Sequence, residues 1–258
     1  MPDSGQKPAI VLIPGIQGRW EWMAPAVHAL EADYRVLTFS LSDVPTPPDN
    51  GSAPGWFNSW ASHIDGLLGS AGVSKAIVSG VSFGSLVAIH YAAVRPGSTS
   101  ALVLASPPGP QLGDDPENDA RLRSPVLALP GFAVRGMMRM APEIAATHPA
   151  WIDRVKFAVP QTARVLAAPP SPRLMAEWVR EWRRTDFAAL SRRITAPTLV
   201  VTGDPALDRI VPVDSSREYL SLIQGARYAC LPRTGHLGVV LQADRFARMV
   251  RDFVHDVS

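Results

Sequence analysis

The sequence predicts an α/β fold, a mostly parallel, doubly wound sheet of about six strands with a helical insertion. Short runs of apolar, often β-branched residues recur along the chain, and segments of helical length separate most of them. Strands buried on both faces have this continuous apolar character, and helices supply the right-handed crossovers between them. A stretch of roughly 90 residues without a convincing strand indicates the insertion.

Six apolar runs that end at turn residues are the expected strands. They are Ala9 to Ile13, Tyr34 to Phe39, Lys75 to Ser79, Ser100 to Ala105, Thr198 to Thr202 and Ala226 to Leu231. The long stretch without a strand falls between the fourth run and the fifth. We therefore expect a core made of residues 1–106 and 194–258, interrupted by an insertion at residues 107–193.

The insertion is predicted to form three or four short helices. An acidic link, Asp114 to Asp119, precedes them, and prolines such as Pro130 and Pro160 are expected to interrupt them. Trp178 and Trp182 lie four residues apart and share a helix face, where they make core contacts or line a pocket. Helical spacing covers Val126 to Met140, His148 to Leu166 and Arg173 to Leu190.

The length fits one domain or two small ones, and the composition indicates a soluble protein and excludes disordered, collagenous and coiled-coil chains. Of the 258 residues, 47% are hydrophobic and 19% are charged, which is ample for a buried core. No apolar run reaches the roughly 18 residues of a membrane span, and Met1 to Lys7 is polar, unlike a signal peptide. One cysteine, Cys230, forms no internal disulfide, and no Cys/His spacing suits zinc. A cytoplasmic location is the expectation.

Positive charge is concentrated in one segment. The formal net charge is only +2, yet residues 121–193 hold twelve Arg and Lys156 against five acids. A solvated helical face is the simpler interpretation, and attraction of an anionic substrate is the other. The Arg residues lack the aromatic interleaving that suits nucleic acid. The expected partner is thus a small molecule, with no nucleic acid and no membrane insertion, and a homo-oligomer stays open.

The most informative stretch is Gly80-Val81-Ser82-Phe83-Gly84, a G-x-S-x-G pentapeptide between a predicted strand and an apolar helical pattern. In such a turn the serine takes a strained backbone conformation, and the glycines remove side chains that would collide. Ser82 Oγ is then presented at a helix N-terminus, where the dipole favours developing negative charge. A packing turn is the competing interpretation. Ser82 is the candidate nucleophile.

A serine nucleophile needs a base and a group that orients the base. Asp208 and His236 follow the fifth and sixth predicted strands, and the carboxyl ends of such strands gather at one edge of the sheet. Asp208 is the candidate acid, with Asp204 as a rival in the same loop. His236 is the candidate base. His148 begins an insertion helix, where a helix-entry role suits it better.

With this order of serine, acid and histidine, the chain resembles the α/β-hydrolase fold over nearly its whole length. The resemblance implies an oxyanion hole made by the backbone N–H groups of Phe83, the residue after the nucleophile, and Ile16, in the loop after the first strand. It also implies that the insertion is a helical cap. The chain departs from the family at Pro14, where His is usual, and at Ser85, where Gly is frequent.

The resemblance implies a serine hydrolase that cleaves a small to medium, partly hydrophobic carboxylic ester or related acyl compound through an acyl-serine intermediate, with no cofactor and no metal. The same triad serves C–C bond hydrolysis, thioester cleavage and acyl transfer in this fold. A ligand-binding module without catalysis is the alternative from another class. The apolar cap favours a hydrophobic substrate, and its Arg surplus leaves room for an acidic group.

Overall fold

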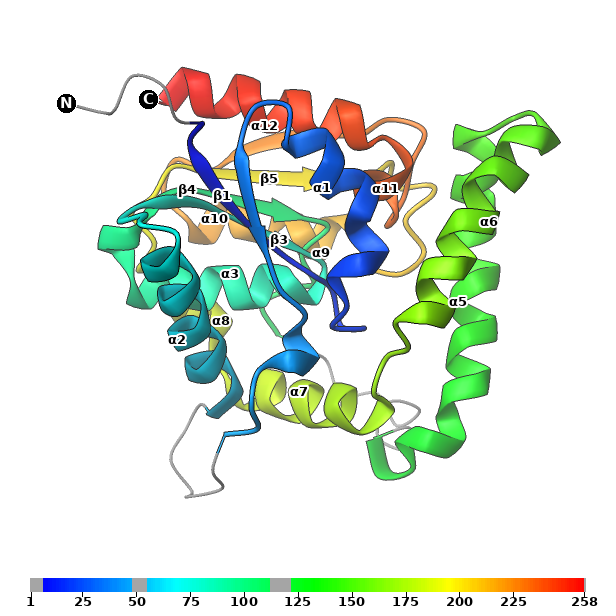
Figure 1. Cartoon of the computed structure of the whole chain (residues 1–258), viewed down its shortest axis with the longest axis horizontal. Coiled ribbons are helices and arrows are strands. Elements are labelled where there is room, and N and C mark those ends of the chain that lie inside the picture. Colours follow the sequence, from blue (N-terminus) through cyan, green and yellow to red (C-terminus); the bar gives the residue numbers. More distant parts are fainter. Residues whose placement is uncertain (1–6, 48–54, 112–121, 258) are drawn as a thin grey trace.

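The six apolar runs pair edge to edge as one parallel sheet in this computed structural model, which describes residues 7–47, 55–111 and 122–257 (Figure 1). The order across the sheet is β2-β1-β3-β4-β5-β6, and every neighbouring pair is parallel. The strands are β1 (Ala9–Ile13), β2 (Arg35–Thr38), β3 (Ala76–Val81), β4 (Thr99–Ala105), β5 (Thr198–Thr202) and β6 (Arg227–Cys230). The predicted fold class is confirmed, and each strand boundary lies within two residues of the predicted one.

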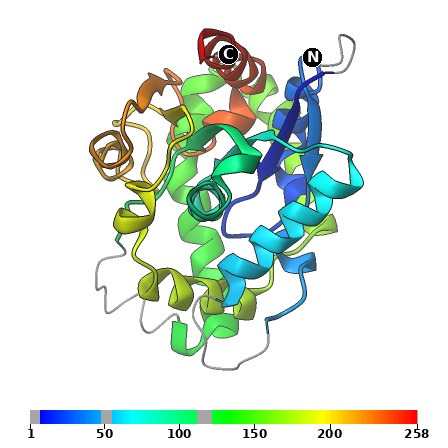
Figure 2. The same cartoon turned by 90° about the vertical axis from the view of Figure 1, so that its left-hand side faces the viewer.

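Helices cover both faces of the sheet (Figures 1 and 2). One face packs against α1 (Ala24–Leu30), α11 (Gly238–Leu241) and α12 (Ala243–Val257). The other face packs against α2 (Gly55–Ser70), α3 (Phe83–Val94) and α10 (Tyr219–Leu222). Shorter elements in the connections are α9 (Val213–Arg217) and the 3₁₀ turns η1 (Trp20–Met23), η2 (Leu41–Asp43) and η3 (Pro96–Ser98).

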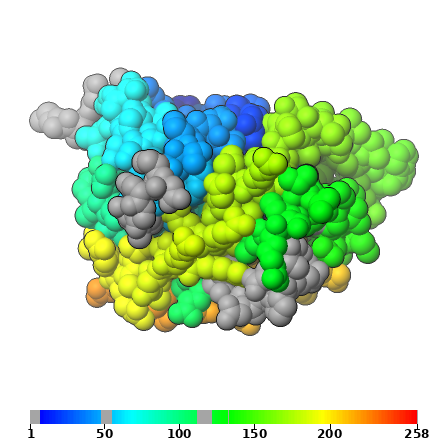
Figure 3. Space-filling view, turned by 90° about the horizontal axis from the view of Figure 1, so that it is seen from below, coloured from blue at the N-terminus to red at the C-terminus, as the bar shows by residue number. Residues whose placement is uncertain are grey.

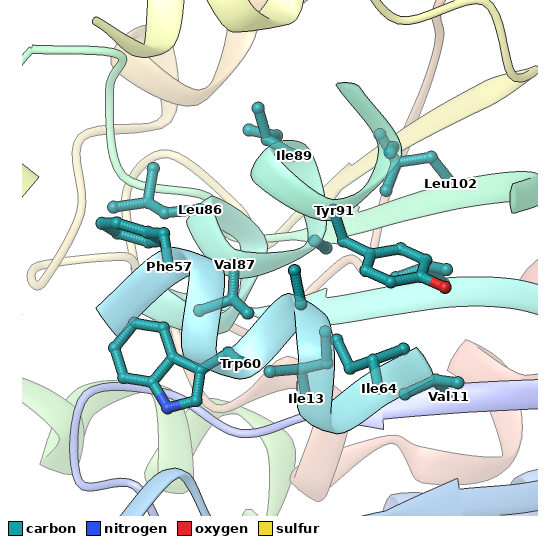
Figure 4. Packing of buried hydrophobic residues seen from close by; sticks show 14 of the residues in the cluster. Val11, Ile13, Phe57, Trp60, Ile64, Leu86, Val87, Ile89, Tyr91 and Leu102 are labelled. Carbon is teal, nitrogen blue, oxygen red and sulfur yellow. The ribbon is translucent and has the colours of Figure 1, made fainter. Parts of the chain in front are cut away.

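Strand β1 shows why these runs are continuously apolar. Ile10 and Leu12 belong to the core on the α1 and α12 side, whereas Val11 and Ile13 belong to the core on the α2 and α3 side. Figure 4 shows the second of these cores, with Trp60 of α2 near Ile13. Successive side chains of a strand point to opposite faces, so a strand that is covered on both sides buries every residue.

From residue 125 on, the described part of the insertion between β4 and β5 forms four helices. They are α5 (Pro125–Thr147), α6 (Trp151–Ala167), α7 (Pro172–Arg184) and α8 (Phe187–Ser191). In Figure 1, α5 and α6 stand beside the core and α7 runs beneath α3; Figure 3 shows the surface of the insertion from below, in green to yellow. The predicted acidic link, Asp114 to Asp119, lies outside the described residues. The insertion limits at 107 and 193 stay a prediction.

The prediction that prolines punctuate these helices is wrong for Pro130 and Pro160. The other prolines that it covered do lie at or between helix ends: Pro125, Pro149, Pro169, Pro170 and Pro172. Helix α5 continues through Pro130 and Pro142, and α6 continues through Pro160. A proline inside a helix removes one backbone hydrogen bond and leaves an earlier carbonyl without its partner. Among the described residues, Glu143 is the only buried one in these two helices, so water reaches most of their backbone and solvates such carbonyls.

The predicted helix at Arg173 to Leu190 is also corrected, because it is two helices. Helix α7 ends before Thr185, and the Asp186 side chain caps the start of α8 by accepting a hydrogen bond from the Ala189 N–H at 2.8 Å. An aspartate with this capping geometry satisfies an amide that has no partner inside the helix, which favours a new helix start over continuation.

The strand order reverses between β1 and β3. The chain leaves β1 toward β2 at one edge, then crosses to β3 on the other side of β1. In open parallel sheets the loops at the carboxyl ends separate at such a reversal and form a crevice. The loop after β1 and the turn after β3 lie at this crevice. In the described ranges, no helix is both long enough and apolar enough to cross a membrane.

Candidate active site

The turn after β3 holds Ser82 in a strained conformation. Its backbone has φ 53° and ψ −124°, a region that residues with a side chain rarely adopt. A Cβ atom on Gly80 would collide with the Gly84 backbone, and one on Gly84 would collide with the Ile13 and Pro14 carbonyl oxygens. Because Gly80 and Gly84 have no side chain, the strand, the turn and the helix can pack with their backbones in contact.

The Ser82 hydroxyl faces a histidine rather than its own helix. Ser82 occupies the N-cap position of α3 but makes no side-chain capping bond there. Its Oγ lies 3.0 Å from His236 Nε2. Ser85, where the family often has Gly, is fully buried and donates its hydroxyl to the Gly80 carbonyl at 2.8 Å, so its polar group is satisfied inside the turn.

Asp208 lies on the other side of the imidazole. Its Oδ2 is 3.4 Å from His236 Nδ1, and its Oδ1 accepts N–H bonds from Ile210 at 3.1 Å and Val211 at 3.0 Å. The Asp208 side chain is only 1% exposed. Burial by itself would raise the pKa of this carboxyl, but the hydrogen bond and charge of His236, with the two amides, outweigh burial and lower it. Asp208 is thus held as a carboxylate.

The acid loop and the histidine loop are in backbone contact. A Cβ on Gly235 would lie 2.9 Å from the Asp208 nitrogen, and one on Gly203 would collide with the Gly235 carbonyl. The Asp204 N–H also donates to the Thr234 carbonyl at 2.7 Å. The two glycines allow the approach that sets Asp208 beside His236.

The rival residues lie elsewhere. The Asp204 carboxylate accepts a hydrogen bond from the Ala206 N–H at 2.9 Å and so caps its own exposed turn. The expectation that His148 begins a helix is wrong, because this residue follows the last residue of α5 and α6 begins only at Trp151; the His148 ring packs against the Phe157 ring at 5.6 Å. The other histidines, His28, His63, His90 and His255, lie within α1, α2, α3 and α12.

The two backbone N–H groups that are expected to bind an oxyanion belong to residues near Ser82. Phe83 is the first residue of α3, where an N–H has no acceptor within the helix. The Pro14 to Gly18 turn, which contains Ile16, is closed by a bond from the Gly18 N–H to the Gly15 carbonyl at 2.8 Å. A Cβ on Gly15 would lie 3.5 Å from Ser82 Cβ, so this turn borders the candidate nucleophile.

Helix α7 packs the insertion onto this region. Trp178 is 1% exposed, and its ring stacks on Phe83 at 6.3 Å, while the Trp182 ring meets Phe83 edge-on at 6.3 Å. The Glu181 carboxylate accepts the N–H groups of Trp56 at 2.9 Å and Phe57 at 3.1 Å, near the start of α2. The two tryptophans therefore make core contacts and also touch the residue after Ser82.

Glu143 is a buried residue near the site that the sequence reasoning missed. It projects from α5, is 1% exposed, and its Oε2 accepts the N–H groups of Gly235 at 2.7 Å and Leu237 at 2.9 Å. Burial raises the pKa of this carboxyl to about 7, against the opposing effect of the two amides. A lone acid in a basic, amphipathic helix carried no signal of these partners.

Part of the basic surplus borders a groove between the insertion and the core. Its volume is about 380 Å³, and Lys156 and Arg164 of α6 line it together with Asp153, His148 and Leu241 of α11. Neither Ser82 nor His236 lines this groove, so the groove that these two cations border is separate from the candidate triad.

A strained serine beside a histidine, at the crevice of a doubly wound parallel sheet, defines an α/β hydrolase. A family model described as "Alpha/beta hydrolase family" matches residues 10–249, and the chain belongs to this family. The predicted resemblance is confirmed.

Known proteins of similar sequence and fold carry hydrolase names. A Klebsiella pneumoniae protein named "Putative carbamate hydrolase RutD" is 23% identical over 95% of this chain and 90% of its own length. A solved hydrolase from Pseudomonas aeruginosa PA01 has TM-score 0.75 at 23% identity, covering 96% of this chain and 90% of that one. An enol-lactonase from Burkholderia xenovorans LB400 has TM-score 0.72 at 21% identity, covering 98% and 93%. The two solved structures share the fold.

Proposed function

We propose that this protein is a serine hydrolase that cleaves a small to medium, partly hydrophobic carboxylic ester or related acyl compound. The observation that carries the proposal is the 3.0 Å separation of Ser82 Oγ and His236 Nε2, in a serine whose φ of 53° turns its hydroxyl away from capping. A serine retained only for packing would use its hydroxyl to cap α3. A base within hydrogen-bond reach is what activates a serine.

In the proposed first step, His236 Nε2 takes the hydroxyl proton while Ser82 Oγ bonds to the acyl carbon of the substrate. The bond to the leaving alcohol then breaks, and His236 returns its proton to the alcohol oxygen. Water next attacks the acyl carbon with His236 as base. The bond from that carbon to Ser82 Oγ then breaks, His236 returns the proton to Oγ, and the carboxylic acid leaves. Asp208, kept ionised by its bond to His236 and by its two amide bonds, orients the ring and stabilises the imidazolium that forms in each half-reaction.

The negative charge that develops on the acyl oxygen needs donors that are already in place. We assign this role to the backbone N–H groups of Phe83 and Ile16. The position of Phe83 at the start of α3 supports the first assignment, and the contact between the Gly15 turn and Ser82 supports the second. The dipole of α3 adds to the stabilisation.

The proposed substrate class follows from the aromatic residues of the insertion near Phe83. Trp182, which is only partly buried and meets Phe83 edge-on, puts apolar surface near the candidate nucleophile, which favours an acyl or alcohol part with hydrophobic character. A carbamate is a second candidate, favoured by the name of the Klebsiella pneumoniae relative and its coverage of 95% of this chain. The same attack on a carbonyl carbon would serve both compounds.

The test is the intact mass of the protein after exposure to a fluorophosphonate, beside the variants Ser82→Ala and His236→Ala. One adduct on the wild type and none on Ser82→Ala is the expected result, because only an activated serine displaces fluoride. Absence of an adduct on the wild type would reject the proposal in favour of a ligand-binding module. A following panel of esters, thioesters, carbamates and C–C substrates would then separate the chemical classes.

A further inference from the structure

The carboxylate of Glu143 holds the two amides on either side of His236. Both N–H groups, from Gly235 at 2.7 Å and Leu237 at 2.9 Å, point to the single oxygen Oε2. These bonds span 92 and 94 residues of sequence and join the insertion to the core. The proposed mechanism does not use Glu143. Among the described residues, no other side chain bonds to the backbone on both sides of His236.

Thr147, one turn further along α5, makes a second bond to the same loop. Its hydroxyl lies 2.9 Å from the Arg233 carbonyl oxygen and 2.9 Å from the Glu143 carbonyl oxygen, and its one proton is shared between these two acceptors. Arg233 has φ 61°, a left-handed conformation that a residue with a side chain adopts only where its surroundings hold it. The last turns of α5 therefore bond to the histidine loop on both sides of His236, at Arg233 and Gly235 before it and at Leu237 after it.

Burial of Glu143 is unfavourable without its partners. A carboxylate removed from water loses hydration, and only hydrogen bonds or charges of opposite sign offset that loss. The charge of His236 favours the ionised form, and the charge of Asp208 opposes it. An apolar residue would fill the same space at lower cost, so the bonds to the histidine loop are the feature that a carboxylate adds.

We propose that Glu143 is a positioning residue that aligns His236 with Ser82 and Asp208 by holding the backbone of residues 235–237. The inference rests on the proposed hydrolysis and adds a condition to it, because the triad is then aligned only while α5 is seated on the core. Glu143 acts through His236 and has no role in touching substrate. The length of its side chain, rather than its charge alone, is the property that matters.

The test compares two conservative variants. Glu143→Gln keeps the reach, and its amide oxygen can accept both N–H bonds, whereas Glu143→Asp keeps the charge but is one methylene shorter. Fluorophosphonate modification is followed at several probe concentrations, which separates the maximal rate from the half-saturating concentration. We expect Glu143→Asp to lower the maximal rate about 10- to 100-fold with little change in half-saturation, and Glu143→Gln to retain most of it.

Glu181→Asp is the matched control, because Glu181 is a second buried carboxylate of the insertion that holds two core amides away from the histidine loop. It should lower the thermal midpoint and leave the maximal rate close to that of the wild type. Hydrogen exchange of residues 233–237 is measured in parallel. It should be faster in Glu143→Asp than in the wild type and unchanged in Glu181→Asp.

The outcomes separate this inference from the proposed function. A wild-type rate in Glu143→Asp would overturn the positioning role, and with a low rate in Glu143→Gln it would replace that role by an effect of charge. A rate in Glu143→Gln as low as in Glu143→Asp would overturn the claim that the reach of the side chain is the property that matters. If the wild type itself did not react, the proposed function would fail. Hydrogen exchange would then decide, since equal exchange in Glu143→Asp and wild type would also reject the ordering of the loop by Glu143.

Discussion

Asp208 and Asp204 lie four residues apart in one loop, but their carboxylates have different surroundings and different partners. Asp208 is buried, lies 3.4 Å from His236 Nδ1 and accepts two backbone amides, whereas Asp204 caps an exposed turn. A carboxylate shielded from water interacts more strongly with a neighbouring imidazolium than an exposed one. We therefore assign orientation of the proposed base to Asp208 alone.

Asp208→Ala should lower the turnover of any hydrolysed substrate by about 10³- to 10⁴-fold, because the imidazole loses its orienting partner and the stabilisation of its charged form. Asp204→Ala, on the same loop, should stay near the wild-type turnover and lose only a turn-capping bond. The measurement is kcat/KM on one substrate, with circular dichroism to verify folding. Equal losses in the two variants would contradict the assignment.

Among the elements, α2 and α3 show opposite requirements for glycine. Gly84 in α3 lies against the Ile13 and Pro14 carbonyls, and no larger residue fits without moving β1 or the turn. Gly66 in α2 is exposed, and no atom of another part of the structure lies within 4 Å of a Cβ placed there. Inside a helix, glycine is less favourable than alanine unless space forbids a side chain.

Gly66→Ala should raise the free energy of unfolding by about 0.5 to 1 kcal/mol, because alanine loses less backbone entropy on folding. Gly84→Ala should lower it and also slow fluorophosphonate modification, because the clash displaces the turn that carries Ser82. Urea unfolding of both variants beside the wild type measures the first effect. A stabilised Gly84→Ala protein would show that the close approach of α3 to β1 is not required.

The insertion helices differ in how they are held. Helix α7 is fastened by Trp178 and by the Glu181 bonds to α2, whereas α6 has no buried residue and exposes Trp151 and Leu166 at 71% and 75%. Local opening requires less free energy where fewer apolar contacts are lost. We expect amides of α6 to exchange with solvent faster than those of α7, and exchange measured by mass spectrometry on the wild type checks the order.

For the molecule as a whole, two buried groups make stability depend on pH in opposite directions. Burial lowers the pKa of His90 to about 4, so the neutral ring stabilises the fold above pH 6.5 and this stability is lost as the pH falls toward 4. Burial raises the pKa of Glu143 to about 7, so its contribution is present below pH 4.5 and is lost as the pH rises through 7. The two effects oppose each other between about pH 4.5 and pH 6.5.

His90→Gln isolates the first effect, because Glu143 is common to both proteins. Relative to wild type, the variant should gain about 3 kcal/mol in free energy of unfolding between pH 7 and pH 4, at 1.36 kcal/mol for each pKa unit. The absolute stability of the variant at pH 7 should be lower, since it alters the hydrogen bond that His90 Nε2 donates to Asn58 Oδ1 at 3.1 Å. Parallel stability curves for the two proteins would contradict the expectation.

Much of the sheet could be predicted because its signals are local. A strand covered on both faces buries every side chain, so Ala9 to Ile13 is apolar throughout, and turn residues mark its end. The course of α5 could not be predicted in the same way. Pro130 indicates an interruption, but whether a helix continues past a proline depends on what surrounds the freed carbonyl, and that surrounding is set by packing.

The sequence by itself determined the α/β fold and the candidates Ser82 and His236, since apolar periodicity and the glycines around a nucleophile are properties of neighbouring residues. Only the tertiary structure decided that Asp208 rather than Asp204 faces His236, and that Glu143 holds the amides beside it. The physical reason is that Glu143 bonds to backbone N–H groups. Because every residue except proline carries a backbone N–H, the identity of a residue gives no signal that its N–H bonds to a side chain 92 positions away.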